Sequence, residues 1–355
     1  MSWLPPDNDD LYDEYDESRI RSRPNPKANR PRSKQRPAHD DAVAGRVVTV
    51  DRGRYLCLVD EGGAAEHEVI ATRARELRTN AIVTGDQVDL VGDASGAEGS
   101  LARIVRIHDR RTLLRRSADD TDAVERIIVA NADQLLIVVA AANPEPRPRL
   151  VDRYLVAAFD AGIDPLLVMT KTDLADPAEF LAQFRGLDLR VVESRSDAAP
   201  VDALRAMLSD RTTVAVGHSG VGKSTLVNAL VPHARRATGV VNAVTGRGRH
   251  TSSSTVSLRL PDGGWIIDTP GVRSFGLGHV DPDNILRSFG DLAEIGASCP
   301  RGCTHLPDAP DCELVERAAA GTLGEFGAER LDSLQRLLST LMTPSGRTGA
   351  DTLRS

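Results

Sequence analysis

Aromatic residues and long apolar runs are both scarce in this chain of 355 residues. Phe, Trp and Tyr make up 3% of the sequence, so Leu, Val, Ala and Ile must fill the core that a hydrophobic content of 41% allows. No apolar run approaches the roughly 18 residues of a membrane span, and the acidic N-terminus is unlike a signal peptide. We therefore expect a cytoplasmic protein without a membrane partner.

Charge is unevenly distributed along the chain. The net charge of −7 gives no general reason to expect nucleic acid as a partner. Residues 1–18 hold seven acidic and no basic side chains, and residues 19–36 hold eight basic and no acidic ones. This pattern predicts a disordered tail over residues 1–41, which is either a solubilising segment or a basic arm that contacts RNA phosphate. Residues 346–355 are expected to be disordered as well.

Residues 42–112 contain five short segments of strand-like composition, separated by Gly-Gly and Gly-Asp turns. The segments are residues 45–50, 55–59, 67–72, 87–91 and 102–107. So many short strands in so short a region indicate a small barrel, for which the OB-fold is the first interpretation. Several arginines would suit an RNA backbone or form a solvated charged rim: Arg103, Arg106, Arg110, Arg111, Arg115 and Arg116.

From residue 124 the pattern becomes an alternation of strands and helices. Apolar runs typical of buried strands occur at residues 134–140, 165–169, 190–192, 213–216 and 265–267. Helical spacing is found over residues 150–161 and 223–230. We expect an α/β domain over residues 113–278, whose parallel sheet binds its ligand at the carboxyl ends of the strands.

Residues 217–224 match the pattern G-x-x-x-x-G-K-S in full, between an expected strand and an expected helix. In such a loop backbone N–H groups surround phosphate oxygens, and the helix N-terminus adds its positive end. Lys223 would reach the terminal phosphates, and the Ser224 hydroxyl would coordinate Mg²⁺. The predicted phosphate-binding residues are Gly217, His218, Ser219, Gly220, Val221, Gly222, Lys223, Ser224 and Thr225.

A second motif, Asp268-Thr269-Pro270-Gly271, follows an expected strand. Asp268 would approach Mg²⁺, and the Gly271 amide would contact the γ-phosphate and sense its loss. The polar stretch between the two motifs, residues 246–251, suits a switch loop. Thr251 is its candidate Mg²⁺ ligand, and Thr255 and Ser252 are competing candidates.

A third motif would read the base. It is Thr170-Lys171-Thr172-Asp173, directly after an expected buried strand. The Asp173 carboxylate would accept hydrogen bonds from guanine N1–H and the exocyclic amine, a pair that adenine does not offer. Ser194 and Ser196, behind the next strand, would serve as a second base-contacting loop. The usual tetrad begins with Asn, so Thr170 departs from it at a position that makes a side-chain bridge.

The order of these motifs is inverted, because an ordinary GTPase has its phosphate loop before the base-reading tetrad. Here the tetrad comes first and Asp268 follows both. This order predicts a circularly permuted GTPase domain, in which residues 272–277 join the γ-phosphate sensor to the C-terminal part. Lysine usage supports the assignment: of only four lysines, the two outside the tail are Lys171 and Lys223, where Arg would not fit without cost.

Three cysteines and one histidine crowd into fourteen residues of the C-terminal part: Cys299, Cys303, His305 and Cys312. Three thiolates and an imidazole form a complete tetrahedral set for one structural zinc ion and leave no position open for a substrate. The alternative is a group of buried, unliganded cysteines beside a surface histidine. Residues 279–345 are expected to form a mostly helical domain around this group.

These motifs together resemble the ribosome small subunit-dependent GTPase A (RsgA) family of bacteria. The resemblance covers about residues 42–342 and rests on residues 217–225, 246–251 and 268–271 and on the Cys-Cys-His-Cys group. It implies an N-terminal OB-fold, a permuted P-loop GTPase domain and a C-terminal zinc-binding domain. It also implies a GTP hydrolase, using Mg²⁺, that binds rRNA of the small ribosomal subunit late in its maturation and is slow until the ribosome stimulates it.

Val272 occupies the place where many GTPases have a Gln that orients the attacking water. We hypothesise that His250 supplies this role once the ribosome orders its loop, with Thr251 and Gly271 as the other catalytic residues. Two alternatives are a GTP-gated RNA-binding factor with little turnover and a permuted GTPase of the large ribosomal subunit. The barrel and the cysteine cluster speak against the latter. We expect a monomer.

Overall fold

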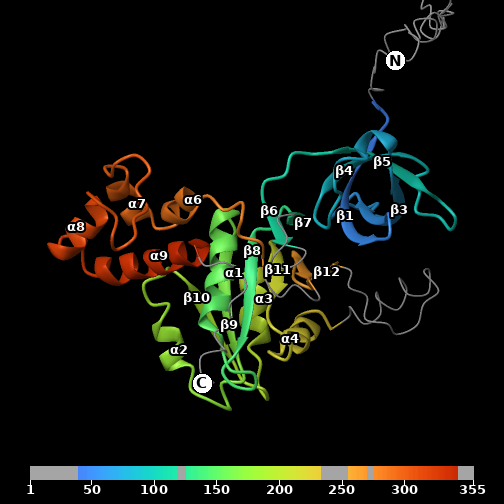
Figure 1. The fold of residues 1–355 in the computed structure, drawn as a ribbon. Coiled ribbons are helices and arrows are strands. Elements are labelled where there is room, and N and C mark those ends of the chain that lie inside the picture. The colour runs from blue at the N-terminus through green and yellow to red at the C-terminus, as the bar shows by residue number, and fades with distance from the viewer. Residues whose placement is uncertain (1–38, 118–124, 233–254, 270–274, 343–355) are drawn as a thin grey trace, which may run out of the picture. The chain divides into compact units, whose positions relative to one another are not determined.

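The computed structural model describes residues 39–117, 125–232, 255–269 and 275–342 (Figure 1). From Asp41 onward these residues belong to one compact unit. No helix within these ranges has both the length and the apolar composition to cross a bilayer. Most of the expected N-terminal tail and all of residues 346–355 lie outside the described residues.

Five strands near the N-terminus close into a barrel. They are β1 (Val43–Asp51), β2 (Arg54–Val59), β3 (His67–Arg73), β4 (Gln87–Gly92) and β5 (Ala102–Ile107). Neighbouring strands follow the order β1-β2-β3-β5-β4, and β4 pairs again with β1. Inward-pointing Val47, Val69 and Ile104 are fully buried. The predicted OB-fold barrel is confirmed.

An antiparallel hairpin of β6 (Leu113–Ser117) and β7 (Glu125–Ala130), which the sequence did not predict, leads from the barrel to the next domain. Asn131 fixes its position, since its Nδ2 donates to the Gly85 carbonyl at 2.9 Å and its Oδ1 accepts from the Arg111 backbone at 2.8 Å. Gly85 has a φ of +91°, and a Cβ there would lie 2.1 Å from the Ala130 oxygen. Only glycine permits this approach.

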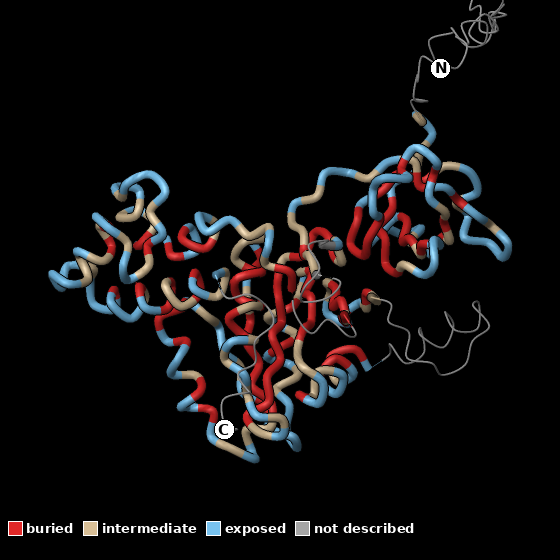
Figure 2. Tube along the Cα trace, in the orientation of Figure 1, coloured by how far each residue is buried: buried red, intermediate tan, exposed pale blue. Residues whose placement is uncertain are grey.

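The central domain is an α/β sheet with helices on both faces. Its strands are β8 (Gln134–Ala140), β9 (Asp164–Thr170), β10 (Arg190–Ser194), β11 (Thr212–Val216), β12 (Val256–Arg259) and β13 (Trp265–Asp268). Their order is β10-β9-β8-β11-β13-β12, and only β12 runs antiparallel to its neighbour β13. All of the predicted strands are present, whereas β12 was not predicted. Figure 2 shows the sheet as the most continuously buried part of this domain.

The two faces of the sheet have separate cores because side chains alternate along each strand. One face packs against α3 (Val201–Leu208) and α4 (Lys223–Leu230). The other face packs against α1 (Pro148–Asp160) and α2 (Ala178–Ala182). The helices expected at residues 150–161 and 223–230 are therefore confirmed as α1 and α4.

The C-terminal helices extend the second of these cores. They are α6 (Pro282–Arg287), α7 (Gly290–Gly296), α8 (Glu313–Ala319) and α9 (Gly327–Met342). Phe275 and Leu334 are fully buried in the same cluster as Tyr154 of α1, and the Tyr154 and Phe275 rings meet edge-on at 5.7 Å. The GTPase domain and the C-terminal helices thus share one hydrophobic core.

A partly buried ion pair adds to this contact. Arg336 of α9 lies 3.2 Å from the Asp152 carboxylate of α1 and stacks over the Phe184 ring at 4.9 Å. Burial raises the pKa of Asp152 to about 6, and Arg336 acts in the opposite direction. Through Arg336, α9 is therefore held to α1 by charge and to the segment after α2 by stacking.

The barrel adds to the edge of the GTPase sheet, since β1 pairs with β12 through Thr49 and Val256. Trp265 of β13 lies at this junction. Its Nε1 donates to Glu61 Oε1 at 2.6 Å, and the Arg46 guanidinium lies over its ring at 5.2 Å. Arg46 also donates to the Thr212 hydroxyl at 2.9 Å. Barrel and sheet therefore meet through a buried aromatic ring and its polar partners.

We predict that Trp265→Ala destabilises the protein by about 3–5 kcal/mol, because a large buried side chain is lost and Glu61 and Arg46 lose a partner. Chemical denaturation would measure the change, and faster proteolysis within residues 107–130 would locate it. Leu101→Ala, at a barrel residue that is 46% exposed, is the control and should cost less than about 0.5 kcal/mol. Equal stability of the two variants would contradict the proposed role of Trp265.

Candidate functional site

The phosphate loop joins β11 to α4 and is shaped by its glycines. Gly220 and Gly222 have φ values of +84° and +91°, a region that glycine adopts without strain. At Gly217 a Cβ would lie 2.6 Å from the Val138 oxygen of the neighbouring strand. Ser219, Gly220, Ser224 and Thr225 are exposed. The loop therefore presents backbone N–H groups and the N-terminus of α4 to solvent, as anion binding requires.

Asp268 lies beside this loop because β13 pairs with β11, with Asp268 opposite Ala215. Its carboxylate forms an ion pair with the Lys223 ammonium. The next residue, Thr269, is buried and donates its hydroxyl to the Ala215 carbonyl at 3.0 Å. The sheet thus brings together two motifs that the chain separates by 44 residues, as counted from Ser224 to Asp268.

The base-reading tetrad also contacts the phosphate loop. Lys171, which has a φ of +57°, donates through Nζ to the Gly220 carbonyl at 2.9 Å and to the Asn143 carbonyl. The Thr170 hydroxyl lies 2.5 Å from the Val221 carbonyl oxygen and 3.3 Å from that of Val139. A bridge from the first tetrad position to the phosphate loop is therefore present with Thr in place of Asn.

Asp173 is exposed at the end of the tetrad. The backbone N–H of Ser196 donates to its Oδ1 at 2.7 Å, and this bond holds the pKa of Asp173 below its usual range. The Ser194 carbonyl accepts from the Thr172 backbone at 3.3 Å, while Ser194 itself is buried. The Asp173 carboxylate is thus ionised at neutral pH and positioned to accept hydrogen bonds.

Asn143 was not predicted as part of this site. It follows β8, whose carboxyl end lies beside that of β11, and its carbonyl helps to fix Lys171. The same loop borders a small recess whose walls include Pro144, Arg147 and His218. The sequence offered one signal that Asn143 belongs to the site, namely its position just after a buried parallel strand.

Three predicted catalytic residues, His250, Thr251 and Gly271, lie outside the described residues. So does Ser252, one of the competing Mg²⁺ candidates. Thr255, the other competitor, is described, and its carbonyl accepts from the Thr84 hydroxyl of the barrel at 3.4 Å.

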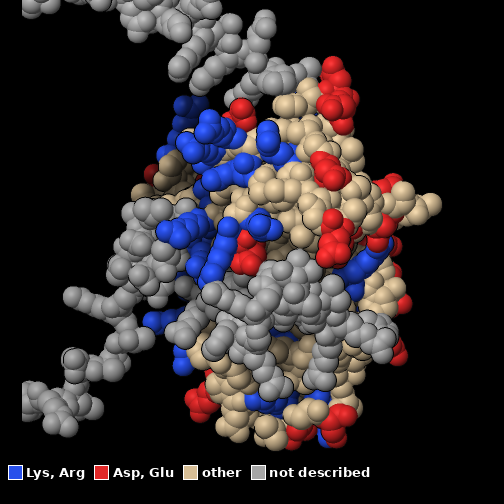
Figure 3. All heavy atoms as spheres, turned by 90° about the vertical axis from the view of Figure 1, so that its right-hand side faces the viewer, with Lys and Arg blue, Asp and Glu red and all other residues tan. Residues whose placement is uncertain are grey.

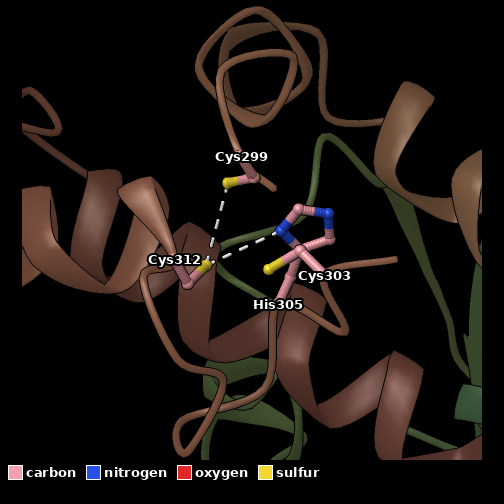
Figure 4. A group of neighbouring side chains, drawn as sticks. All are labelled: Cys299, Cys303, His305 and Cys312. Atoms are coloured by element: carbon pink, nitrogen blue, oxygen red, sulfur yellow. Dashed lines mark hydrogen bonds between the residues drawn. The ribbon is translucent and has the colours of Figure 1, made fainter. Parts of the chain in front are cut away.

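The four cysteine and histidine residues of the C-terminal part converge, as Figure 4 shows. Their ligand atoms all lie within 4.8 Å of one another. Cys312 Sγ is 4.0 Å from Cys299 Sγ and 3.7 Å from His305 Nδ1. A tetrahedron with Zn–S bonds of about 2.3 Å has edges of about 3.8 Å, so this donor set fits one zinc ion.

The local fold explains why these side chains meet. Cys299 follows α7, and Cys312 directly precedes α8. The His305 carbonyl accepts from Gln335 of α9 at 3.0 Å, which fixes the loop between them. Burial lowers the pKa of His305, so its imidazole is neutral and able to act as a ligand.

Comparison with known proteins agrees with this geometry. The model of a family described as RsgA GTPase matches residues 107–278. The small ribosomal subunit biogenesis GTPase RsgA of Chlorobaculum parvum is 32% identical over 312 residues, which cover 85% of this chain and 99% of that relative. The chain belongs to the RsgA GTPase family. It is accordingly a P-loop GTP hydrolase.

Other relatives and solved structures extend the comparison. The protein of the same name from Chromohalobacter salexigens is 37% identical, over 83% of this chain and 86% of the relative. The crystal structure of YjeQ from Thermotoga maritima superposes with a TM-score of 0.62 at 23% identity, over 85% of this chain and 99% of that one. YloQ, described as a circularly permuted GTPase, gives 0.59 at 24% identity, over 86% and 96%. The predicted permuted RsgA fold is confirmed.

We predict that Cys312→Ala abolishes metal binding, because three ligands no longer complete the tetrahedron. Metal analysis of the purified protein should find about one zinc ion in the parent chain and almost none in the variant. Cys57→Ala, which removes a buried cysteine of the barrel, is the matched control and should keep the zinc. If Cys312→Ala bound as much zinc as the control, the group would not be the metal site.

We predict that Asp173→Asn shifts nucleotide preference from GTP toward xanthosine triphosphate, because the new amide donates where guanine also donates. Competition binding of the two nucleotides would measure a change of at least about tenfold in their affinity ratio. Asp197→Asn changes a neighbouring exposed carboxylate that pairs with Arg195 and should leave the ratio as it is. An unchanged ratio in Asp173→Asn would remove the base-reading assignment.

Proposed function

We propose that this chain is a ribosome-stimulated GTPase that acts in late maturation of the small ribosomal subunit and binds its rRNA. Its relatives carry the name small ribosomal subunit biogenesis GTPase RsgA. The relation extends over barrel, GTPase domain and cysteine cluster, because the chain covers 99% of one such relative. The Lys223–Asp268 pair beside the Thr170–Val221 contact is the observation that carries the nucleotide-binding part.

GTP would lie along the carboxyl edge of the sheet, between these contacts. Asp173 would accept from guanine, and the backbone of residues 217–224 would surround the phosphates. Mg²⁺ bound with GTP would neutralise phosphate charge, and Ser224 and Asp268 would be the residues that hold it. Lys223 would turn from Asp268 to the terminal phosphates, since a single ammonium cannot be fully engaged with both.

The zinc ion held by the Cys-Cys-His-Cys group would be structural. Four protein ligands leave no coordination position for a substrate. The group lies against the core shared by α1 and α9, so zinc would fix the loops that join the C-terminal helices. The metal would therefore support the C-terminal unit rather than take part in hydrolysis.

The barrel is the part most suited to rRNA. Figure 3 shows Lys and Arg gathered on the upper part of one face, with Asp and Glu mostly to one side of them. Arg54 lies opposite Thr72, which in turn lies opposite Arg103, so β2 and β5 direct arginines to the same outer face. The exposed arginines of the barrel are Arg52, Arg54, Arg73, Arg75, Arg78, Arg103 and Arg106. Such a surface matches a phosphate backbone.

The permuted chain order would link nucleotide state to the C-terminal unit. Thr269 is fixed to β11 by its hydroxyl. Six residues later, Phe275 is buried against α1, and its carbonyl accepts from Arg153 at 3.0 Å. A displacement at Asp268 or Gly271 would therefore act on the few residues that lead to Phe275, whose position is fixed by its contact with α1. Release of γ-phosphate would alter the contact between α1 and the zinc-bearing helices.

We expect His250→Ala to reduce ribosome-stimulated turnover by about 10²-fold, if His250 positions the attacking water. GTP affinity should be unaffected, because the residue is not part of the phosphate or base loops. Single-turnover hydrolysis with saturating small subunits would test this. Unchanged stimulated turnover together with normal GTP binding would transfer the role to another residue.

The proposed function as a whole is tested by GTP turnover measured with small subunits, with large subunits and with neither. Turnover with neither subunit should be slow, because Val272 stands where many GTPases have a Gln that orients water. Small subunits, and not large ones, should raise it. Stimulation by large subunits and not by small ones would favour the large-subunit alternative, and equal stimulation by both would contradict the proposed specificity. Binding to small subunits without any stimulation would favour the GTP-gated RNA-binding factor.

A further inference from the structure

Thr170 holds a position that the usual tetrad gives to Asn, and the two side chains differ in what they can donate. A hydroxyl carries one hydrogen, whereas a side-chain amide carries two on its nitrogen. Thr170 is buried, and its hydroxyl lies 2.5 Å from the Val221 carbonyl oxygen and 3.3 Å from that of Val139. Its single hydrogen is therefore used by the phosphate loop.

The base has two polar edges, and Thr170 lies toward one of them. Asp173 would take the N1–H and the exocyclic amine. The opposite edge carries the acceptors O6 and N7, and N7 belongs to the five-membered ring that also bears the ribose and, through it, the phosphates. Because Thr170 contacts Val221 within the phosphate loop, it would lie toward the five-membered ring of a bound guanine and away from the edge that Asp173 would read.

We propose that Thr170 is a positioning residue that ties the base loop to the phosphate loop and leaves guanine N7 without a side-chain hydrogen bond. The protein then reads guanine by the edge that faces Asp173 and accepts 7-deazaguanosine nucleotides, which lack N7, as readily as GTP. This inference rests on the proposed binding of GTP at this site. The side-chain amide of an Asn at residue 170 would donate one N–H to the Val221 carbonyl and have a second N–H to donate to guanine N7.

Several neighbouring donors are already engaged within the site. Lys171 Nζ donates to two backbone carbonyls, of Asn143 and Gly220. The Ser196 N–H donates to Asp173, and the Thr172 N–H donates to Ser194. Within the described base loops, these N–H groups hold the tetrad in place, and of the groups named here only the third N–H of the Lys171 ammonium is not used by these bonds.

The test compares the affinities of GTP and 7-deaza-GTP for the full chain, by displacement of a fluorescent guanine nucleotide. The parent chain should bind the two within about twofold of each other, and Thr170→Ser should behave like the parent because it keeps the hydroxyl. Thr170→Asn should acquire a preference for GTP of about fivefold or more, the size expected for one added hydrogen bond. Thr170→Val should bind both nucleotides about tenfold more weakly at an unchanged ratio.

Thr213→Val is the matched control, since it removes a buried hydroxyl of β11 that bonds Gln134 at 3.1 Å and does not contact the phosphate loop. It should bind both nucleotides like the parent.

A tenfold preference of the parent for GTP over 7-deaza-GTP would overturn the inference and leave the proposed function intact. So would parent-like affinity in Thr170→Val. If the parent bound neither nucleotide, the proposed function itself would fail. If Thr170→Val does not fold, the inference is still tested by the ratio of GTP to 7-deaza-GTP affinity in the parent chain and in Thr170→Asn.

Discussion

The parallel pairing of β11 with β8 on one side and β13 on the other is the interaction on which the site depends. β11 is buried along its whole length, so its carboxyl end has a fixed position. β13 brings Asp268 to Lys223, and β9, beyond β8, brings Thr170 to Val221. Three motifs meet because their strands are neighbours in the sheet. Chain order does not enter this geometry, and permutation therefore leaves Lys223, Asp268 and Thr170 beside one another.

Permutation instead changes what the site is attached to. The strand that carries Asp268 leads within a few residues to Phe275, which is buried beside Tyr154 in the core shared by α1 and α9. Beside this strand, β12 pairs with β1 of the barrel, and Trp265 of β13 holds that junction through Glu61 and Arg46. The barrel thus contacts β13 directly, and the C-terminal part follows β13 in the chain and packs against α1. The base-reading tetrad, by contrast, joins the phosphate loop through Thr170 and Lys171.

Sequence patterns predicted the elements with strong local signals. Residues 134–140 and 223–230 were predicted with the bounds of β8 and α4, because a continuous apolar run and a phosphate-loop motif mark them. β12 was missed because it is four residues long, and its pairing with β1 is a contact between distant parts of the chain. The Thr170–Val221 contact joins residues 51 positions apart. No local sequence pattern predicts a contact between residues so far apart in the chain. The sequence therefore shows that Thr replaces Asn at residue 170, but it does not show which atoms the Thr170 hydroxyl contacts.

We propose that nucleotide state reaches the C-terminal helices, which surround the Cys-Cys-His-Cys group, through the segment from Asp268 to Phe275. Amide hydrogen exchange of the full chain with GDP and with a non-hydrolysable GTP analogue tests it most directly. Such coupling predicts different exchange between the two states in α1, α6 and α9, in addition to the phosphate loop. If exchange changed only within the nucleotide site and these three helices exchanged identically in both states, the coupling would be contradicted.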